Sequence, residues 1–347
     1  MLVFAAMRES LLAILDCPSC RSDRGLGLTA SESDGDEVTR GDLSCSICGR
    51  KYLVTNGIAR FVEPSDDYCK NFGFQWQRWK DLQIDRLSGH HLSEKRFFAE
   101  VPWNREWMQG KLLLDAGCGA GRFADVAAVH GARVVACDLS IAVDACREVT
   151  RAHGTAVQQV QASIYALPFR QRVFDGVYCL GVIQHTPDPT RTMETLPVYL
   201  KPTGLLAYDF YQRTSWERPY IPRWMLRRFT RTWPTKRTLL LSHVLTAAFF
   251  PVATLLNRVP VLNSLAPAFP IAVVSDPELS LKQEYLWSLL DTFDWYGPAH
   301  EQRQDFHEVA KLLSRIGMQD IVARPGVVTA RAPLVAHETE PGANANV

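Results

Sequence analysis

The chain has 347 residues, of which 47% are hydrophobic and 22% are charged. This composition is typical of a soluble globular protein, long enough for one large domain or two smaller ones. The formal net charge of +1 argues against a protein that holds nucleic acid over its whole surface, although a local basic patch stays open.

The beginning of the chain is apolar but carries Arg8, Glu9 and Asp16. It shows neither a basic leader nor a small-residue cleavage site, so we expect no signal peptide. Nine cysteines are present, and five of them are scattered through apolar segments. This usage suits a reducing compartment with one metal site better than a disulfide framework. We therefore expect a cytoplasmic protein.

The other four cysteines lie in a first module, residues 9–63. Cys17 and Cys20 form one C-x-x-C pair, and Cys45 and Cys48 form a second pair after 24 intervening residues. Four thiolates at this spacing suit tetrahedral zinc, and a shell filled by protein ligands makes the metal structural. Chance pairs of buried cysteines and a redox dithiol are the alternatives. We predict one structural Zn²⁺ held by the four thiolates.

The middle of the chain has the pattern of a parallel α/β sheet, since short apolar strands alternate with amphipathic helical segments. Helices are expected at 122–130 and 141–153. The expected strands are 111–115, 132–138, 157–161, 173–180 and 204–210. The predicted fold class is α/β, with a Rossmann-like doubly wound sheet.

Five segments are expected along the chain. The zinc-ribbon module is followed by an aromatic lid or linker, and the α/β domain is interrupted by a helical insertion or cap. The last residues are expected to be disordered. The boundaries are 9–63 for the ribbon, 64–108 for the lid, 109–212 and 281–330 for the α/β domain, 213–280 for the insertion and 331–347 for the tail.

The strongest motif follows the first expected strand and reads Asp115-Ala-Gly-Cys-Gly-Ala-Gly121. Glycines let the backbone turn sharply and approach a ligand, and the helix that follows offers free N–H groups. Gly117, Gly119 and Gly121 are spaced G-x-G-x-G, which departs from the dinucleotide fingerprint G-x-G-x-x-G. Asp138 ends the next strand, where a carboxylate can accept hydrogen bonds from ribose hydroxyls. A plain turn is the alternative.

In this order the motifs resemble those of class I S-adenosylmethionine-dependent methyltransferases. Residues 162–169, 174–185 and 200–206 resemble the family's later motifs, with Ser163 where the family usually has an Asp. The resemblance implies S-adenosyl-L-methionine as cofactor, with Asp115 near its methionine end. The cofactor contacts that it implies are Asp115, Gly117, Cys118, Gly119, Gly121, Asp138, Leu139, Ser163, Ile164 and Leu180.

The resemblance suggests functions for the aromatic segment and for the cysteine module. In related enzymes a segment before the core covers the cofactor, so Phe72, Gln75 and Trp76 are expected to cover it here. Aromatic spacing on a helix is equally typical of core packing. The cysteine module resembles the small zinc-ribbon activator protein of some methyltransferases, fused here ahead of the catalytic domain.

Methyl transfer is an in-line displacement, for which an enzyme supplies alignment and in some cases a base. His185 lies past the fourth strand and Asp209 at the fifth. Some small-molecule O-methyltransferases that resemble this chain use a His and an Asp at these places. Our hypothesis is that His185 is a general base with Asp209 as its partner, and the alternative is that His185 packs in a turn. Candidate acceptor contacts are Trp295, Tyr296 and His300.

The insertion is unusual in charge and hydropathy. Residues 213–237 contain eight Lys or Arg and a single acid, Glu217, and residues 239–256 are an apolar run of 18. The run is marginal for spanning a bilayer, and a basic segment beside an apolar helix can instead lie in a membrane interface. A helical cap over the active site, or a dimer contact, is the favoured interpretation. A peripheral membrane contact through 213–260 stays open.

Together these features predict an S-adenosylmethionine-dependent methyltransferase that acts on oxygen in a small metabolite, a glycan or a lipid-linked precursor. RNA base methylation is an alternative, since some ribosomal RNA methyltransferases begin with a four-ligand zinc module. The near-neutral charge, and the sequence Leu180-Gly-Val-Ile-Gln-His185 in place of an Asn/Asp-Pro-Pro-aromatic motif, weigh against it and against a nucleic-acid partner. A non-catalytic cofactor-binding scaffold is the other alternative.

Overall fold

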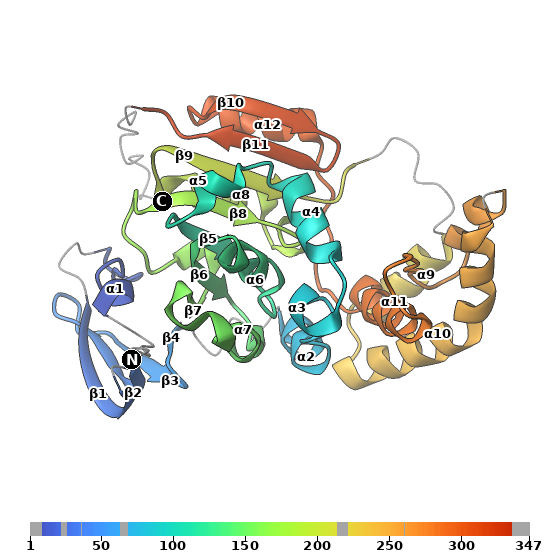
Figure 1. Ribbon diagram of the computed structural model, residues 1–347, viewed down its shortest axis with the longest axis horizontal. Helices are drawn as coiled ribbons and strands as arrows, with labels where there is room; N and C mark the ends of the chain where they lie inside the picture. Colours follow the sequence, from blue (N-terminus) through green and yellow to red (C-terminus); the bar gives the residue numbers. More distant parts are fainter. Residues whose placement is uncertain are drawn as a thin grey trace, which may run out of the picture.

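The computed structural model describes residues 9–21, 26–35, 37–62, 69–213, 221–259 and 261–334. All the strands in these ranges belong to one 11-stranded sheet, in the order β1-β2-β3-β4-β7-β6-β5-β8-β9-β11-β10. Helices flank the middle of this sheet and extend beyond it at one end of the molecule (Figure 1).

The centre of the sheet is parallel and runs in the order β7-β6-β5-β8-β9. The chain moves outward from β5 to one side and then returns to the other, so the sheet is doubly wound. The prediction of a Rossmann-like α/β fold is confirmed. Residue bounds are β5 (Leu112–Ala116), β6 (Arg133–Asp138), β7 (Val157–Ala162), β8 (Phe174–Cys179) and β9 (Leu200–Asp209), with α6 (Arg122–Val129), α7 (Ala142–Thr150) and α8 (Pro189–Thr195) between them.

Burial on both faces explains why these strands are apolar runs. In β5, Leu113, Leu114 and Ala116 are fully buried. Such strands occur where helices cover both faces of a sheet. In a sheet of this kind a crevice forms at the carboxyl ends of the strands, where the strand order reverses. Here the reversal lies between β5 and β8.

Two antiparallel strands complete the far edge, β10 (Gln319–Arg324) and β11 (Val327–Arg331), and β11 pairs with β9. The helix α12 (Phe306–Arg315) packs against both of them. Since β11 ends at Arg331, the ordered strand includes the first residue of the segment that we expected to be disordered. Residues 332–334 of that segment are also described, and Ala332 is buried, whereas residues 335–347 lie outside the described residues.

The cysteine module is joined to the other edge of the sheet. Its strands β1 (Leu26–Asp34), β2 (Glu37–Cys45), β3 (Lys51–Thr55) and β4 (Ile58–Phe61) are antiparallel to one another, and α1 (Glu9–Leu12) precedes them. The last of them, β4, pairs in parallel with β7. Side chains of the module, such as Leu15 and Leu43, share a buried cluster with Val160 and Phe169 of the α/β core.

The aromatic segment is helical, with α2 (Lys70–Arg78), α3 (Asp85–Ser88), α4 (Leu92–Glu100) and α5 (Arg105–Met108). The first of these helices packs closely on α7 and also contacts α11. A Cβ on Gly73 would lie 2.8 Å from Cγ1 of Ile141, so glycine allows this close approach. The helix α2 is therefore fixed over the end of the core where β6 leads into α7.

The described part of the insertion, within residues 221–259 and 261–280, is largely helical, and it lies at the end of the molecule opposite the cysteine module (Figure 1). Its helices are α9 (Ile221–Thr230) and the long α10 (Thr235–Arg258), which packs on α11 (Leu281–Tyr296). A capping box formed by Ser280 and Gln283 begins α11. Short 3₁₀ helices are η1 (Arg151–Ala156), η2 (Ile164–Ala166), η3 (Ile183–His185), η4 (Leu196–Tyr199) and η5 (Asn263–Ala268).

Candidate functional site

A cavity of about 260 Å³ opens beyond the carboxyl ends of β5, β6 and β8. The loop after each of these strands contributes to its wall, and α2 and α11 contribute from the opposite side. The residues predicted from the sequence that line it are Phe72, Gln75, Trp76, Gly117, Cys118, Gly119, Asp138, Leu139, Ile164, Leu180, His185 and Trp295. The predicted residues that do not line it are Asp115, Gly121, Ser163, Asp209, Tyr296 and His300.

The glycine loop needs its glycines for two separate reasons. Gly119 has a φ of 51° and Gly121 a φ of 87°, and both lie in the left-handed region that favours glycine. A Cβ on Gly119 would lie 2.9 Å from Nε1 of Trp76, which faces the cavity from α2. A Cβ on Gly121 would lie 2.8 Å from Sγ of Cys146, in α7. Gly119 therefore serves the cavity, whereas Gly121 serves the packing of two helices.

Asp138 connects the loop to the end of β6. Its carboxylate accepts hydrogen bonds from the backbone N–H of Gly119 at 2.9 Å and from the backbone N–H and hydroxyl of Ser140 at 2.8 and 2.7 Å. Burial raises the pKa of Asp138 above its ordinary value. The same carboxylate lines the cavity, so it is placed to accept hydrogen bonds from a ligand hydroxyl there.

Asp115 lies behind the loop and is almost fully buried. Burial, followed by repulsion from Asp138, raises the pKa of Asp115 to about 8. Its Oδ2 atom is buried and has no hydrogen-bond partner among the described residues. The Tyr178 hydroxyl of β8 interacts with the same carboxyl group and opposes this rise in pKa, and Asp115 does not line the cavity.

On the opposite side of the cavity wall, Ile164 lines the site and Ser163 does not. The hydroxyl of Ser163 accepts a hydrogen bond from the backbone N–H of Tyr165 at 3.3 Å and caps η2. Ser163 therefore caps η2 and does not contribute to the cavity. The wall of the cavity near this position is apolar and is formed by Ile164 and Leu139.

His185 is 6% exposed and its ring faces the cavity between Phe72 and Tyr211, with ring centroids 5.0 and 5.6 Å away. Its Nδ1 atom lies 3.0 Å from the backbone oxygen of His300. Because a carbonyl oxygen only accepts, Nδ1 must carry the proton. The neutral ring then has its lone pair on Nε2, which can accept a proton.

Asp209 has other partners than the histidine we expected. Its carboxylate accepts hydrogen bonds from the Arg96 guanidinium at 2.6 Å and from the backbone N–H of Gly181. Arg96 also pairs with Glu100 at 2.9 Å. The carboxylate that interacts electrostatically with His185 is Asp294, on α11. The expected interaction partner of His185 was Asp209, but the carboxyl group that interacts with His185 in the structure is that of Asp294.

Sequence reasoning missed several charged groups in the wall. Asp291 and Asp294 lie one helical turn apart on α11 and both line the cavity. Burial, followed by the nearby Asp294 carboxylate, raises the pKa of Asp291 to about 7. Arg122 directly follows the glycine loop, and burial lowers its pKa to about 9. Position after the glycines could have pointed to Arg122, whereas nothing local distinguishes the two aspartates.

Of the three candidate acceptor contacts, only Trp295 lines the cavity. Tyr296 is fully buried, and its hydroxyl donates to the backbone oxygen of Pro270 at 2.8 Å. His300 contributes through its backbone oxygen, which orients His185. The guanidinium of Arg223 lies over the Trp295 ring, 4.4 Å from its centroid, and so connects this wall to the insertion.

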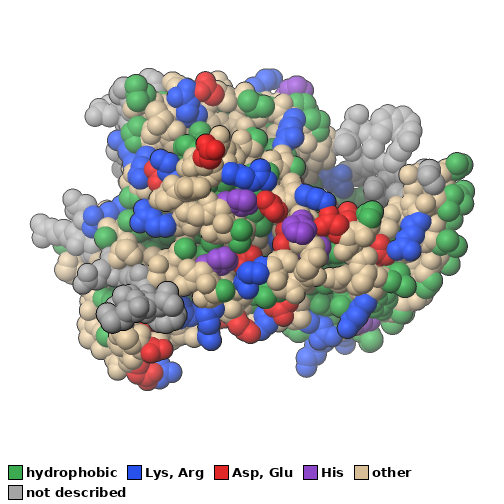
Figure 2. Space-filling model, viewed as in Figure 1, with side chains coloured by type: hydrophobic (Ala, Val, Ile, Leu, Met, Phe, Trp, Pro, Cys, Tyr) green, Lys and Arg blue, Asp and Glu red, His purple; other side chains and the backbone are tan. Residues whose placement is uncertain are grey.

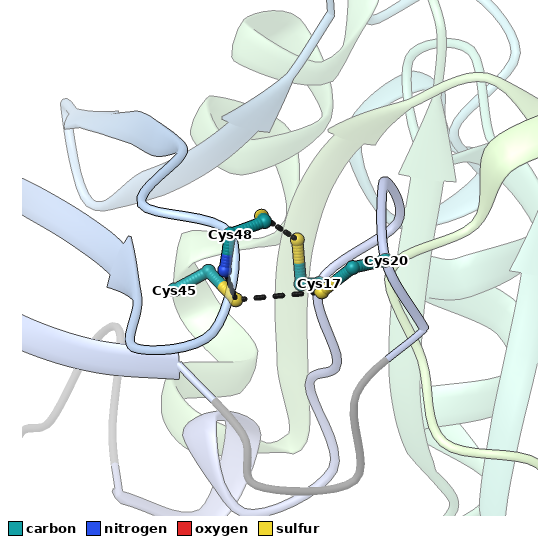
Figure 3. A group of neighbouring side chains, drawn as sticks. All are labelled: Cys17, Cys20, Cys45 and Cys48. Carbon is teal, nitrogen blue, oxygen red and sulfur yellow. Dashed lines mark hydrogen bonds between the residues drawn. The ribbon is translucent and has the colours of Figure 1, made fainter.

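The four cysteines of the N-terminal module converge at one point between two loops (Figure 3). Their sulfur atoms all lie within 4.8 Å of one another. The Cys17 and Cys48 sulfurs are 3.6 Å apart, and those of Cys20 and Cys45 are 3.5 Å apart. Four sulfurs bound to zinc at about 2.3 Å would be about 3.8 Å apart. The cluster could therefore hold a tetrahedral metal ion with little movement.

Comparison with known proteins bears on both parts of the chain. Residues 114–208 match a family model described as a methyltransferase domain, and residues 8–57 match one described as Trm112p-like protein. The ubiquinone biosynthesis O-methyltransferase of Azotobacter vinelandii is 32% identical over 146 residues, which are 39% of this chain and 59% of that protein. That of Vibrio atlanticus is 29% identical over 157 residues, with shares of 44% and 64%. The match therefore spans about three fifths of these relatives.

Among solved structures, magnesium protoporphyrin IX methyltransferase from Synechocystis, with bound SAH, aligns at 17% identity and a TM-score of 0.42 over 77% of this chain and 97% of that one. A complex of the Haloferax volcanii Trm112 methyltransferase activator with a putative methyltransferase aligns at 20% identity and 0.32, over 44% and 62%. The family matches confirm both resemblances. The chain therefore contains a segment that matches a methyltransferase domain, residues 114–208, preceded by a segment that matches Trm112p-like protein, residues 8–57.

Proposed function

We propose that the protein transfers the methyl group of S-adenosyl-L-methionine to an oxygen atom of a small or lipid-linked acceptor. One observation carries the proposal. A single cavity is lined by Gly119 and Asp138, which suit the cofactor, and by His185, which suits an acceptor hydroxyl. The family match and the O-methyltransferase relatives support it.

The cofactor side of the cavity fits S-adenosyl-L-methionine in its shape and its polar groups. The loop at Gly117 and Gly119 presents backbone without side chains, and Trp76 covers it from α2. Asp138 would accept from the ribose hydroxyls, and Arg122 would offer its cation to the cofactor carboxylate. When bound, the cofactor supplies an electrophilic methyl group on a sulfonium.

The acceptor side provides a base and a carboxylate. An acceptor hydroxyl near Nε2 of His185 would transfer its proton to that nitrogen as the new carbon–oxygen bond forms and the carbon–sulfur bond breaks. The imidazolium that results is favoured by the Asp294 carboxylate nearby. His185 is kept in the right tautomer by the backbone oxygen of His300.

We also propose that the four cysteines hold one structural Zn²⁺, since thiolates at this spacing fill a tetrahedral shell. The domain boundaries expected from the sequence remain part of the proposal. We propose that the protein acts in the cytoplasm on a small-molecule or lipid-linked acceptor.

Calorimetry with S-adenosyl-L-methionine tests the first step. The wild-type protein should bind with measurable heat, and Asp138→Ala should weaken binding by at least about tenfold through loss of the ribose acceptor. Glu308→Ala, an exposed carboxylate on α12, is the matched control and should bind normally. Absence of binding by the wild type overturns the proposal.

Labelled-methyl transfer into cell extract, followed by fractionation, tests the second step. The label should appear in a small or lipid-soluble product. Label in RNA would favour base methylation, and cofactor binding without transfer to any fraction would favour a scaffold.

A further inference from the structure

The long helix α10 exposes an unusual amount of apolar surface. By length and composition it could cross a membrane, with a mean hydropathy of 2.0 over 18 residues, yet only 28% of that window is buried. A core helix of comparable hydropathy would be mostly buried. Most of the apolar window of α10 therefore lies at the surface of the protein.

The exposed side of α10 is a continuous apolar stripe. Leu240, Val244, Val252 and Leu255 are exposed, with 65% of Leu240 and 65% of Leu255 accessible. Their spacing places them on one face of the helix. The gap between Val244 and Val252 is filled by the exposed residues Ala247, Ala248 and Pro251.

The side of α10 that faces the protein carries hydroxyl groups. Thr238, Ser242, Thr246 and Thr254 are buried there. The Oγ1 atoms of the three threonines have no hydrogen-bond partner among the described residues. Phe250 and Ala253 are also buried on this face, so the inner face mixes hydroxyl and apolar side chains while the exposed stripe is apolar.

The exposed apolar surface continues past both ends of α10. Before it, Met225 and Phe229 of α9 and the following Trp233 are exposed, and after it Val261 and Leu265 are exposed. In the space-filling view, hydrophobic side chains run along the edge of the molecule where Figure 1 places α10 (Figure 2). A contiguous apolar surface of this kind marks an interaction site.

The positive charge of residues 218–275 indicates a partner with negative charge. Residues 218–275 contain no Asp or Glu. Arg228, Arg231, Lys236 and Arg237 are exposed and surround Trp233 in the sequence, and none of them has an ion-pair partner among the described residues. Apolar side chains flanked by a Trp and unpaired cations are typical of an element that lies in the interface of an anionic bilayer.

We propose that α10, with the end of α9 and the residues around η5, docks on an anionic lipid bilayer and lies in its interface. The helix does not span, because its inner face packs along α11, which carries Glu284 and other charged side chains. A second copy of the chain is a poorer occupant, since a two-fold contact would bring the same unpaired cations near one another.

The docking surface is connected to the cavity. Arg227 of α9 donates to the backbone oxygen of Trp295 at 2.9 Å, and Arg223 pairs with the buried Glu301. Trp295 lines the acceptor side of the cavity. Resting on the proposed function, this connection points to an amphiphilic acceptor whose apolar part stays in the bilayer while its hydroxyl reaches His185.

Vesicle flotation of the full chain tests the surface. We expect the wild type to float with vesicles that contain phosphatidylglycerol and much less with phosphatidylcholine alone. Val244→Glu with Leu255→Glu should reduce flotation by at least about tenfold, because both exposed side chains lose their apolar contact. Lys236→Ala with Arg237→Ala should weaken binding to the anionic vesicles and lessen its dependence on salt.

Val322→Glu and Leu53→Glu are the matched controls, since both residues are exposed hydrophobics on other elements, and both variants should float like the wild type. Calorimetric binding of S-adenosyl-L-methionine by every variant shows that the fold is intact. Wild-type protein that stays unbound, or a dimer in light scattering that the α10 double variant dissociates, overturns the proposal. Flotation requires no acceptor, so its failure leaves the methyltransferase proposal standing.

Discussion

At the scale of single residues, the histidine in the wall is the group whose chemistry is best defined. The backbone oxygen of His300 fixes the proton of His185 on Nδ1, so Nε2 is the basic atom. Asp294, on α11, is the carboxyl group that interacts electrostatically with His185, while burial raises the pKa of Asp294. Variants at these two positions test a catalytic role for His185 against a packing role in the η3 turn.

His185→Ala should lower kcat by about 10²- to 10⁴-fold, the usual contribution of a general base, and leave cofactor affinity nearly unchanged. Asp294→Asn should lower kcat less, because a neutral amide no longer interacts favourably with the positive charge that His185 gains during proton transfer. Steady-state kinetics and calorimetry measure both. Unchanged turnover in His185→Ala would remove this residue from the mechanism.

The raised pKa of Asp115 predicts how the free energy of unfolding depends on pH. Its pKa rises from an ordinary value of 3.8 to about 8 on folding, so the folded protein binds a proton that the unfolded chain releases. The stability from this group is present below about pH 4 and declines by up to about 1.4 kcal/mol per pH unit until about pH 8.

Asp115→Asn should remove this decline, so urea unfolding between about pH 5 and pH 8 should show a flatter stability profile than the wild type. Asp320→Asn, at an exposed carboxylate, is the control and should keep the wild-type slope. Equal slopes for all three proteins would contradict the raised pKa.

At the scale of elements, the approach of α2 to the glycine loop decides how the cavity is closed. Gly119→Ala should weaken cofactor binding, because its Cβ meets Trp76 and its φ is left-handed. Gly89→Ala carries a similar conformational strain, at φ 77°, but its Cβ would meet open space. Calorimetry should therefore show a loss of affinity for Gly119→Ala alone.

The same scale shows what sequence patterns can and cannot predict. The strands β5 to β8 were predicted to within one or two residues, because buried parallel strands are apolar runs separated by amphipathic helices. The start of β9 at Leu200 was missed by four residues, since Lys201, Pro202 and Thr203 favour a turn. The pairing of β4 with β7 joins residues 101 positions apart, such as Ala59 and Val160, and no local pattern records such a contact.

In the cavity, too, some residues could be predicted from local sequence patterns and others could not. Residues of the glycine loop and Asp138 were predicted because their chemistry depends on local spacing at strand ends. Asp291 and Asp294 could not be distinguished from surface acids, because only the packing of α11 turns them toward the cavity. Tyr296 and Trp295 are neighbours in the sequence, yet the helix turns only Trp295 to the site.

At the scale of the whole molecule, the zinc-ribbon module and the α/β core share one sheet and one buried cluster. If the four cysteines hold zinc as proposed, its removal should therefore destabilise the entire chain. We expect a chelator, or Cys20→Ser, to lower the Tm by roughly 5 °C or more while a single cooperative transition remains. Cys69→Ser, outside the cluster, should leave the metal content at one ion per chain. A stable, metal-free protein with an unchanged Tm would contradict the site.

The parallel pairing of β4 with β7 has one more consequence. Without residues 9–62, β7 would be the last strand of the sheet and would expose a row of unpaired backbone N–H and C=O groups. A bare strand of this kind is a template for pairing with other chains. We therefore expect the module to protect this edge of the sheet from aggregation, so a truncated chain should precipitate even when its cofactor loop is intact.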